Sequence, residues 1–144
     1  MNVLFVCSGN RARSQLAEGW ARKLAPAGVQ VWSAGTRPHP DGVNPMAVEV
    51  MEEKGVDISR HYSKSLSDVP LDVDYVITLC SEADAACPML SARVARLAWH
   101  LPDPAIAGTD ERALRRLFRE IRDEIERRVR ELFSGPPFRK PKPI

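Results

Sequence analysis

The chain has 144 residues, 44% of them hydrophobic and 28% charged, which is the composition of one globular domain with a substantial core. Its formal net charge of +2 gives no dedicated surface for nucleic acid or for a membrane, so neither is expected as a partner. The apolar stretch at the N-terminus has no basic flank and is too short for a signal sequence or a membrane span, so a cytoplasmic location is expected.

Strands and helices are predicted to alternate along the chain. The predicted strands are residues 2–6, 29–33, 75–79 and 94–99, and the predicted helices are residues 14–25, 45–54 and 109 or 110 to 132. This alternation predicts an α/β fold: a single-domain three-layer sandwich with a four-stranded parallel sheet of order 2-1-3-4 and helices on both faces. The domain is expected to span residues 1–133, followed by a flexible tail rich in proline and lysine over residues 134–144.

The most informative segment follows the first predicted strand directly and reads Cys7-Ser-Gly-Asn-Arg-Ala-Arg-Ser14. A loop of small residues between a strand and a helix N-terminus can hold a tetrahedral oxyanion, because backbone N–H groups point inward and the helix dipole favours negative charge. A cysteine at its mouth is held as the nucleophilic thiolate. The candidate substrate-binding residues are Ser8, Gly9, Asn10, Arg11, Ala12 and Arg13.

Individual side chains of this loop have more specific expected roles. The planar guanidinium of Arg13 can bind two oxygens of an anion, and Ser14 can donate a hydrogen bond to the sulfur of Cys7. Arg11 either lines the mouth of the loop or is solvated. A lone cysteine is most often a small buried hydrophobic residue, but the complete eight-residue unit favours a catalytic role for Cys7.

Two further candidates follow later strands. Cys80 comes just after the third predicted strand, and Asp103 lies a few residues after the fourth. With the strand order 2-1-3-4, Cys7, Cys80 and Asp103 are expected to meet at the carboxyl edge of the sheet. Asp103 precedes a proline, so it is either an ordinary turn residue or a general acid that protonates a departing oxygen.

A third cysteine, Cys87, makes the cysteine count odd, which argues against a static disulfide framework. There is no C-x-x-C pair and there are only three histidines, so no metal site is expected. The histidines, His39, His61 and His100, are predicted to be surface or structural residues.

The loop resembles the C-x5-R-S phosphate loop of the low-molecular-weight protein tyrosine phosphatases. The stretch from Cys7 to Ala21 more closely resembles the thioredoxin-coupled arsenate reductases built on the same fold. The resemblance covers nearly the whole chain to about residue 132, and its further matches are Ser33-Ala-Gly35, Gly42-Val-Asn-Pro45, Thr78-Leu-Cys80, Cys87-Pro88 and Asp103-Pro-Ala105. It favours the general-acid role for Asp103, whereas Ala105 lacks the aromatic ring that the phosphatases usually have there.

Reduction of arsenate to arsenite takes two electrons, and thiols can supply them. Cys7 can form the covalent adduct, Cys80 can then attack Cys7 and release arsenite, and Cys87 can attack Cys80 to regenerate Cys7. The resemblance implies this same relay, ending in a Cys80–Cys87 disulfide that thioredoxin reduces, with no bound cofactor. Regular helix would place these two cysteines about 10 Å apart, against the roughly 7 Å that a disulfide allows, so the segment is expected to rearrange on oxidation.

Some relatives bind potassium beside the phosphate loop, and the resemblance places Asn10, Glu18 and Ser33 at that site. The fourth position is Lys64, whose ammonium can replace the cation, so no potassium dependence is expected.

Two other functions are compatible with these residues. The chain could be a phosphomonoesterase that uses Cys7, Arg13 and Asp103, or a non-enzymatic sensor that binds arsenic or responds to redox through its three thiols. Arsenate is the expected substrate, phosphate and sulfate are expected competitors, and the chain is expected to be a monomer.

Overall fold

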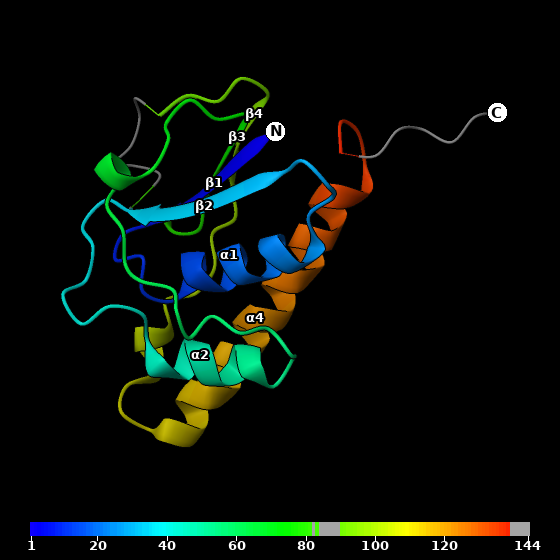
Figure 1. The fold of residues 1–144 in the computed structure, drawn as a ribbon. Helices are drawn as coiled ribbons and strands as arrows, with labels where there is room; N and C mark the ends of the chain where they lie inside the picture. The colour runs from blue at the N-terminus through cyan, green and yellow to red at the C-terminus, as the bar shows by residue number, and fades with distance from the viewer. Residues whose placement is uncertain (82, 84–89, 139–144) are drawn as a thin grey trace.

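The computed structural model describes residues 1–81, 83 and 90–138. Four strands form one parallel sheet in the order β2-β1-β3-β4, which confirms the predicted topology (Figure 1). The strands are β1 (Asn2–Cys7), β2 (Gln30–Gly35), β3 (Tyr75–Thr78) and β4 (Ala95–Ala98). β1 and β3 are the central pair, so the residues that follow them leave the sheet side by side at its carboxyl edge.

The central strands are buried on both faces, which explains their continuous apolar sequences. Val3 to Val6 of β1 are fully buried, and so are Val76 and Ile77 of β3. A strand of this kind has no solvated face and therefore shows no polar alternation. The edge strand β4 is only half-buried over most of its length.

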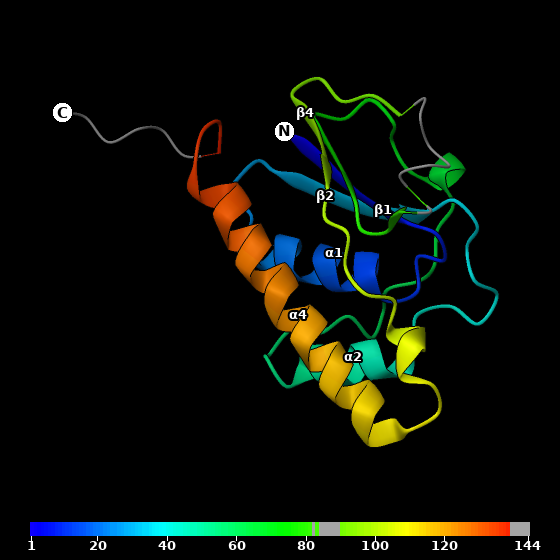
Figure 2. The same ribbon diagram turned by 180° about the vertical axis from the view of Figure 1, so that it is seen from behind.

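Three helices lie on one side of the sheet, and Figure 2 shows the long α4 running across the other two. They are α1 (Arg13–Leu24), α2 (Pro45–Glu52) and α4 (Glu111–Ser134). The described residues also form two short 3₁₀ turns, η1 (Leu66–Asp68) and η2 (Pro104–Ala107). On the opposite face, where helices were also predicted, the described residues form no helix of comparable length (Figure 2). Asn44 and Asp110 cap α2 and α4, because their side chains accept hydrogen bonds from backbone N–H groups of the first turn.

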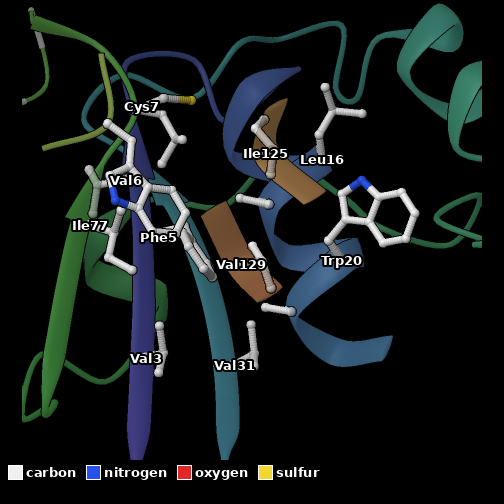
Figure 3. Close-up of a cluster of buried hydrophobic side chains, with 14 of the residues drawn as sticks. Val3, Phe5, Val6, Cys7, Leu16, Trp20, Val31, Ile77, Ile125 and Val129 are labelled. Carbon is white, nitrogen blue, oxygen red and sulfur yellow. The ribbon is translucent and has the colours of Figure 1, made fainter. Parts of the chain in front are cut away.

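The core lies between the sheet and the two helices α1 and α4. Figure 3 shows Phe5 of β1 facing Leu16 of α1 and Ile125 and Val129 of α4. Full burial of each such side chain contributes about 2 kcal/mol. The same view shows the sulfur of Cys7 at the end of β1, beside the loop that enters α1. The packed core therefore fixes both ends of this loop.

Gly19 lies inside α1 at the point where the helix meets neighbouring segments. A Cβ there would lie 2.8 Å from Cγ2 of Ile58 and 2.9 Å from Cε of Met51. Glycine costs about 1 kcal/mol in a helix interior, and here it permits a contact that no larger residue allows.

The predicted element boundaries differ from the observed ones by at most two residues, as is usual where helices fray and strands end. Two details lie outside the prediction. α4 continues to Ser134, and the ring of Phe138 packs on Phe133 and Tyr75 with centroids 4.9 and 5.1 Å away. No helix of the described part of the chain is long and apolar enough to cross a bilayer.

Candidate active site

Three chain segments converge at the carboxyl edge of the sheet. Cys7 is the last residue of β1, and Cys80 lies two residues after the end of β3. The N–H of Leu79 donates to the carbonyl of Val6 (2.9 Å), so the pairing of the two strands continues up to the cysteines. The segment after β4 joins them, because the N–H of Leu101 donates to the carbonyl of Leu79 (3.2 Å).

The sulfur of Cys7 has two hydrogen-bond partners. The backbone N–H of Asn10 donates to it at 3.2 Å, and the hydroxyl of Ser14 lies 2.8 Å away. The amide of Asn10 donates to the Ser14 oxygen at 2.8 Å, so the hydroxyl hydrogen is left to point at the sulfur. Both groups therefore act as donors, and donors facing a sulfur stabilise its negatively charged form.

Asn10 has a left-handed backbone conformation with φ of 48°, which costs a non-glycine residue about 1–2 kcal/mol. Hydrogen bonds from its fully buried side chain offset this cost. Its Oδ1 accepts from Gln15 Nε2 (2.9 Å) and from the N–H of Lys64 (2.8 Å), and its Nδ2 donates to Ser14 and to Ser33 (3.0 Å). Asn10 is therefore the residue that shapes the turn of the loop.

The two arginines of the loop are held differently. Arg13 is only 9% exposed, and its Nη1 donates to the carbonyl of Leu101 at 3.1 Å. Arg11 donates from Nη1 to the carbonyl of Gly42 at 2.9 Å and lines the mouth of the cavity above the loop. The first of the two alternatives left open for Arg11 is therefore the correct one.

A cavity of about 350 Å³ opens above the loop. Its lining brings together residues from the loop, the segment after β2 and the segment around η2, namely Cys7, Ser8, Gly9, Arg11, Ala12, Arg13, His39, Asn44, Asp103, Pro104, Gly108 and Leu114. Asp103 thus shares a cavity with Cys7, as a general acid requires. Cys80 is buried and does not line this cavity.

His39 is exposed, in agreement with its prediction as a surface residue, but it also lines the cavity, which the sequence analysis did not predict. It lies on the cavity wall rather than on a remote surface. Nothing in the local sequence indicates this, because Pro38 and Pro40 flank it in a stretch that is typical of an exposed loop.

A buried ionic cluster lies behind the loop, around Glu18 of α1. Its carboxylate accepts from Ser33 (2.5 Å) and lies 3.3 Å from Lys64 Nζ and 3.3 Å from His61 Nδ1. Burial raises the pKa of Glu18, but the hydrogen bond from Ser33 and the neighbouring positive charges outweigh it and hold the pKa below its usual value. Lys64 supplies a cation to the group formed by Asn10, Glu18 and Ser33.

Two of the three cysteines of the expected relay, Cys7 and Cys80, lie within the described residues. Cys80 is buried, and the N–H of Ala83 points at its sulfur at 3.3 Å. Cys87, its pairing with Cys80 and the expected rearrangement lie outside the described residues. Within the described ranges no group of three or more His, Cys, Asp or Glu residues could hold a metal ion.

These features define a class. A cysteine at the end of a central strand, an arginine six residues later at the start of a helix, and an aspartate that lines the same cavity are the groups expected of a phosphate-loop enzyme with a thiol nucleophile. The family model for low molecular weight phosphotyrosine protein phosphatases matches residues 2–140, and the chain belongs to this family.

Within the family the chain is similar to arsenate reductases. Arsenate reductase 1 of Staphylococcus haemolyticus is 43% identical over 130 residues, which cover 90% of this chain and 92% of that protein. A solved arsenate reductase in the phosphate-binding state superimposes with a TM-score of 0.77 at 32% identity, covering 92% of this chain and 96% of that one. A thioredoxin-dependent arsenate reductase of Corynebacterium glutamicum superimposes with a TM-score of 0.70 at 34% identity. The match covers 92% of this chain and 60% of that one.

Proposed function

We propose that this protein is an arsenate reductase that uses Cys7 as nucleophile and passes the oxidation to Cys80 and then Cys87, from which thioredoxin removes it. The observation that carries the proposal is the position of Cys80, which follows the strand next to the one that ends in Cys7. Hydrolysis of a phosphate ester needs no second thiol there. The similarity of nearly the whole chain to arsenate reductases supports the same activity.

In the first step the Cys7 thiolate attacks the As(V) atom of bound arsenate and a sulfur–arsenic bond forms. One oxygen leaves as water, with a proton supplied by Asp103 on the cavity wall. Arg13 and the backbone N–H groups of the loop bind the remaining oxygens and stabilise their negative charge. The arsenic atom is still As(V) at this point.

In the second step the thiolate of Cys80 attacks the sulfur of Cys7. A Cys7–Cys80 disulfide forms while the sulfur–arsenic bond breaks, and its electron pair stays on arsenic, which leaves as arsenite. The two thiols are thereby oxidised by two electrons and the arsenic is reduced by two. The N–H of Ala83 beside the Cys80 sulfur stabilises the thiolate that this attack needs.

In the third step the Cys87 thiolate attacks Cys80 and releases Cys7 as a thiolate, and a dithiol protein then reduces the Cys80–Cys87 disulfide. This role of Cys87 rests on its spacing and on the family resemblance, and the thioredoxin dependence printed for the Corynebacterium protein supports thioredoxin as the reductant. The chemistry requires a reducing compartment, for which we propose the cytoplasm, and no bound cofactor. We further propose that the protein acts as a monomer, with phosphate and sulfate as competing anions.

The test measures arsenate turnover with thioredoxin, thioredoxin reductase and NADPH for the wild type, Cys80→Ser and Cys87→Ser. Cys87→Ser is expected to release about one arsenite per enzyme and then stop, because its Cys7–Cys80 disulfide has no internal thiol to resolve it. Cys80→Ser is expected to release none. Steady-state turnover of Cys87→Ser at the wild-type rate would remove Cys87 from the mechanism.

A phosphomonoesterase remains the second candidate, because Cys7, Arg13 and Asp103 are the groups that such an enzyme needs. Ala105 supplies no aromatic ring for a phosphotyrosine substrate. Hydrolysis of para-nitrophenyl phosphate by Cys80→Ser separates the two activities. A hydrolytic rate far above the rate of arsenate reduction in the wild type would favour the phosphatase. A sensor without enzymatic activity would need neither Arg13 nor Asp103.

A further inference from the structure

We propose that His39 is a substrate-binding residue, whose imidazole donates a hydrogen bond from Nε2 to an oxygen of the tetrahedral oxyanion bound above Cys7. This inference deepens the proposed function and rests on it only in requiring that such an oxyanion occupies the phosphate loop. It is carried by the position of the His39 backbone, by the hydrogen bond at the other ring nitrogen and by the cavity that the residue lines.

The backbone of His39 is held directly on the phosphate loop. The segment after β2 continues beside the loop through three backbone hydrogen bonds. The N–H of Thr36 donates to the carbonyl of Cys7 (3.1 Å), and the N–H of Arg37 donates to that of Ser8 (2.8 Å). The N–H of His39 donates to the carbonyl of Gly9 (3.0 Å). A Cβ placed on Gly9 would lie 3.7 Å from the Cβ of His39, so the side chain starts immediately beside the loop. The distance between His39 and the oxyanion position is therefore set by backbone contacts.

The protonation pattern of the His39 ring is set by a turn. The N–H of Asp41 donates to Nδ1 of His39 at 3.0 Å, and the N–H of Gly42 donates to its carbonyl at 3.1 Å. A ring nitrogen that accepts a hydrogen bond carries no proton, so in the neutral imidazole the proton is on Nε2. Nε2 has no hydrogen-bond partner within residues 1–81, 83 and 90–138.

Arg11 fixes the same turn from the opposite side. Its guanidinium donates to the carbonyl of Gly42 at 2.9 Å, and the N–H of Asn44 donates to the carbonyl of Arg11 at 2.9 Å. Arg11 and His39 thus both line the cavity, which Asp103 lines as well. A small tetrahedral oxyanion in this cavity meets the positive charge of Arg11 and a second hydrogen-bond donor from His39.

The side chain of His39 is 41% exposed, so its hydrogen bond competes with water and is weaker than a buried one. The expected effect of losing the donor is therefore a moderate loss of anion affinity. Two matched variants separate the donor from the shape of the ring: His39→Phe keeps a ring of similar size without a donor, and His39→Gln keeps an N–H close to the position of Nε2.

The test uses inorganic phosphate as the probe and measures how it protects Cys7 from iodoacetamide, with the labelled Cys7 peptide quantified by mass spectrometry. His39→Phe is expected to bind phosphate about 3- to 10-fold more weakly than the wild type, and His39→Gln within about twofold of it. Asp41→Asn is the control, because it keeps the backbone N–H that holds Nδ1, and its affinity is expected to equal that of the wild type. Wild-type affinity in His39→Phe, or an equal loss in Asp41→Asn, would overturn the proposal.

A second measurement addresses the tautomer directly and does not depend on how well any variant folds. Long-range ¹H–¹⁵N spectra of the wild type are expected to show His39 protonated at Nε2, with that resonance shifting when phosphate is added. A proton on Nδ1, or an Nε2 resonance insensitive to phosphate, would contradict the inference. Neither measurement contains arsenate or a reductant, so a protein that failed to reduce arsenate could still give the expected result for His39.

Discussion

At the scale of single residues, Lys64 places a positive charge beside a buried carboxylate. Its ammonium is buried, lies 3.3 Å from the Glu18 carboxylate and donates to the carbonyl of Tyr62 at 3.1 Å. The aromatic ring of Tyr62 covers it, with the centroid 4.8 Å away. A covalently attached cation beside Glu18 leaves no role for a dissolved one, which is the physical basis for the expected independence of potassium.

Wild-type turnover is expected to be the same in potassium and sodium salts of equal ionic strength. Lys64→Gln leaves the Glu18 carboxylate buried without this partner, so it is expected to lower the free energy of unfolding by about 3 kcal/mol, and potassium is expected to restore part of the loss. Urea unfolding in each salt measures this, with the exposed Lys54→Gln as the control. Activation of the wild type by potassium over sodium would contradict the interpretation of Lys64.

At the scale of elements, the loop between α2 and β3 is attached to α1 through His61. Its Nδ1 lies 3.0 Å from Oε1 of Gln15 and 3.3 Å from Oε2 of Glu18, and Gln15 in turn donates to Asn10. A hydrogen on Nδ1 orients the Gln15 amide so that its NH₂ faces the phosphate loop. The N-terminal part of α1 and the loop around His61 therefore stabilise the phosphate loop together.

Burial lowers the pKa of His61, although the charge of Glu18 acts in the opposite direction. The unfolded chain, with an ordinary histidine pKa near 6.5, therefore binds more protons than the folded protein just below that pH. The contribution of His61 to stability is expected to be complete above about pH 6.5 and to be lost as the pH falls toward the lowered value. Urea midpoints measured across this range are expected to fall less steeply with pH in His61→Asn, whereas parallel curves for the two proteins would contradict the assignment.

The helices α2 and α4 are joined by two arginines of α4 that share Glu53. Arg122 is buried and also donates to the carbonyl of Val50 at 3.0 Å, whereas the side chain of Arg119 is 48% exposed. These hydrogen bonds and charges lower the pKa of Glu53 to about 2. Glu53 therefore forms one exposed and one buried ion pair, and substituting each arginine in turn compares their contributions to stability.

Arg119→Gln is expected to reduce the free energy of unfolding by less than about 1 kcal/mol, because water screens an exposed pair. Arg122→Gln is expected to cost about 2–4 kcal/mol, because it leaves a buried carbonyl without its donor and removes packed methylene groups. Urea denaturation of both variants at neutral pH measures the difference. Equal losses would show that burial does not set the strength of this contact.

At the scale of the whole molecule, Phe138 closes one end of the structure. It lies inside the segment predicted to be a flexible tail, yet its ring contacts Phe133 at the end of α4 and Tyr75 at the start of β3. The long helix is thereby attached to the sheet at the edge opposite the active site, where the strands begin. The composition of the tail does not indicate this contact, because it depends on where α4 ends in space.

Phe138→Ala is expected to lower the free energy of unfolding by about 1–2 kcal/mol, through loss of two aromatic contacts and partial burial, with no change in phosphate affinity. Ile106→Ala is the matched control, because Ile106 is 72% exposed and its truncation is expected to have no measurable effect on stability. Calorimetry of both variants decides this. A stability of Phe138→Ala equal to that of the wild type would show that the aromatic contacts contribute nothing in solution.

The sequence by itself was sufficient to predict the parallel sheet, its strand order and the phosphate loop. These depend on short-range patterns: apolar runs for the central strands, and an eight-residue unit from Cys7 to Ser14 that carries its own nucleophile and anion-binding groups. The adjacency of Cys7 and Cys80 also followed from the sequence, because neighbouring parallel strands end at the same edge.

Only the tertiary structure decided which side chains support that loop. The left-handed turn at Asn10, the position of Arg11 and the place of His39 on the cavity wall depend on partners that are distant in the chain. Local spacing places a residue on a strand or a helix, but the direction of its side chain is determined by packing against segments that the spacing does not identify. For that reason the candidate nucleophile is evident in the sequence, and the residues that hold it in position are evident only in the folded chain.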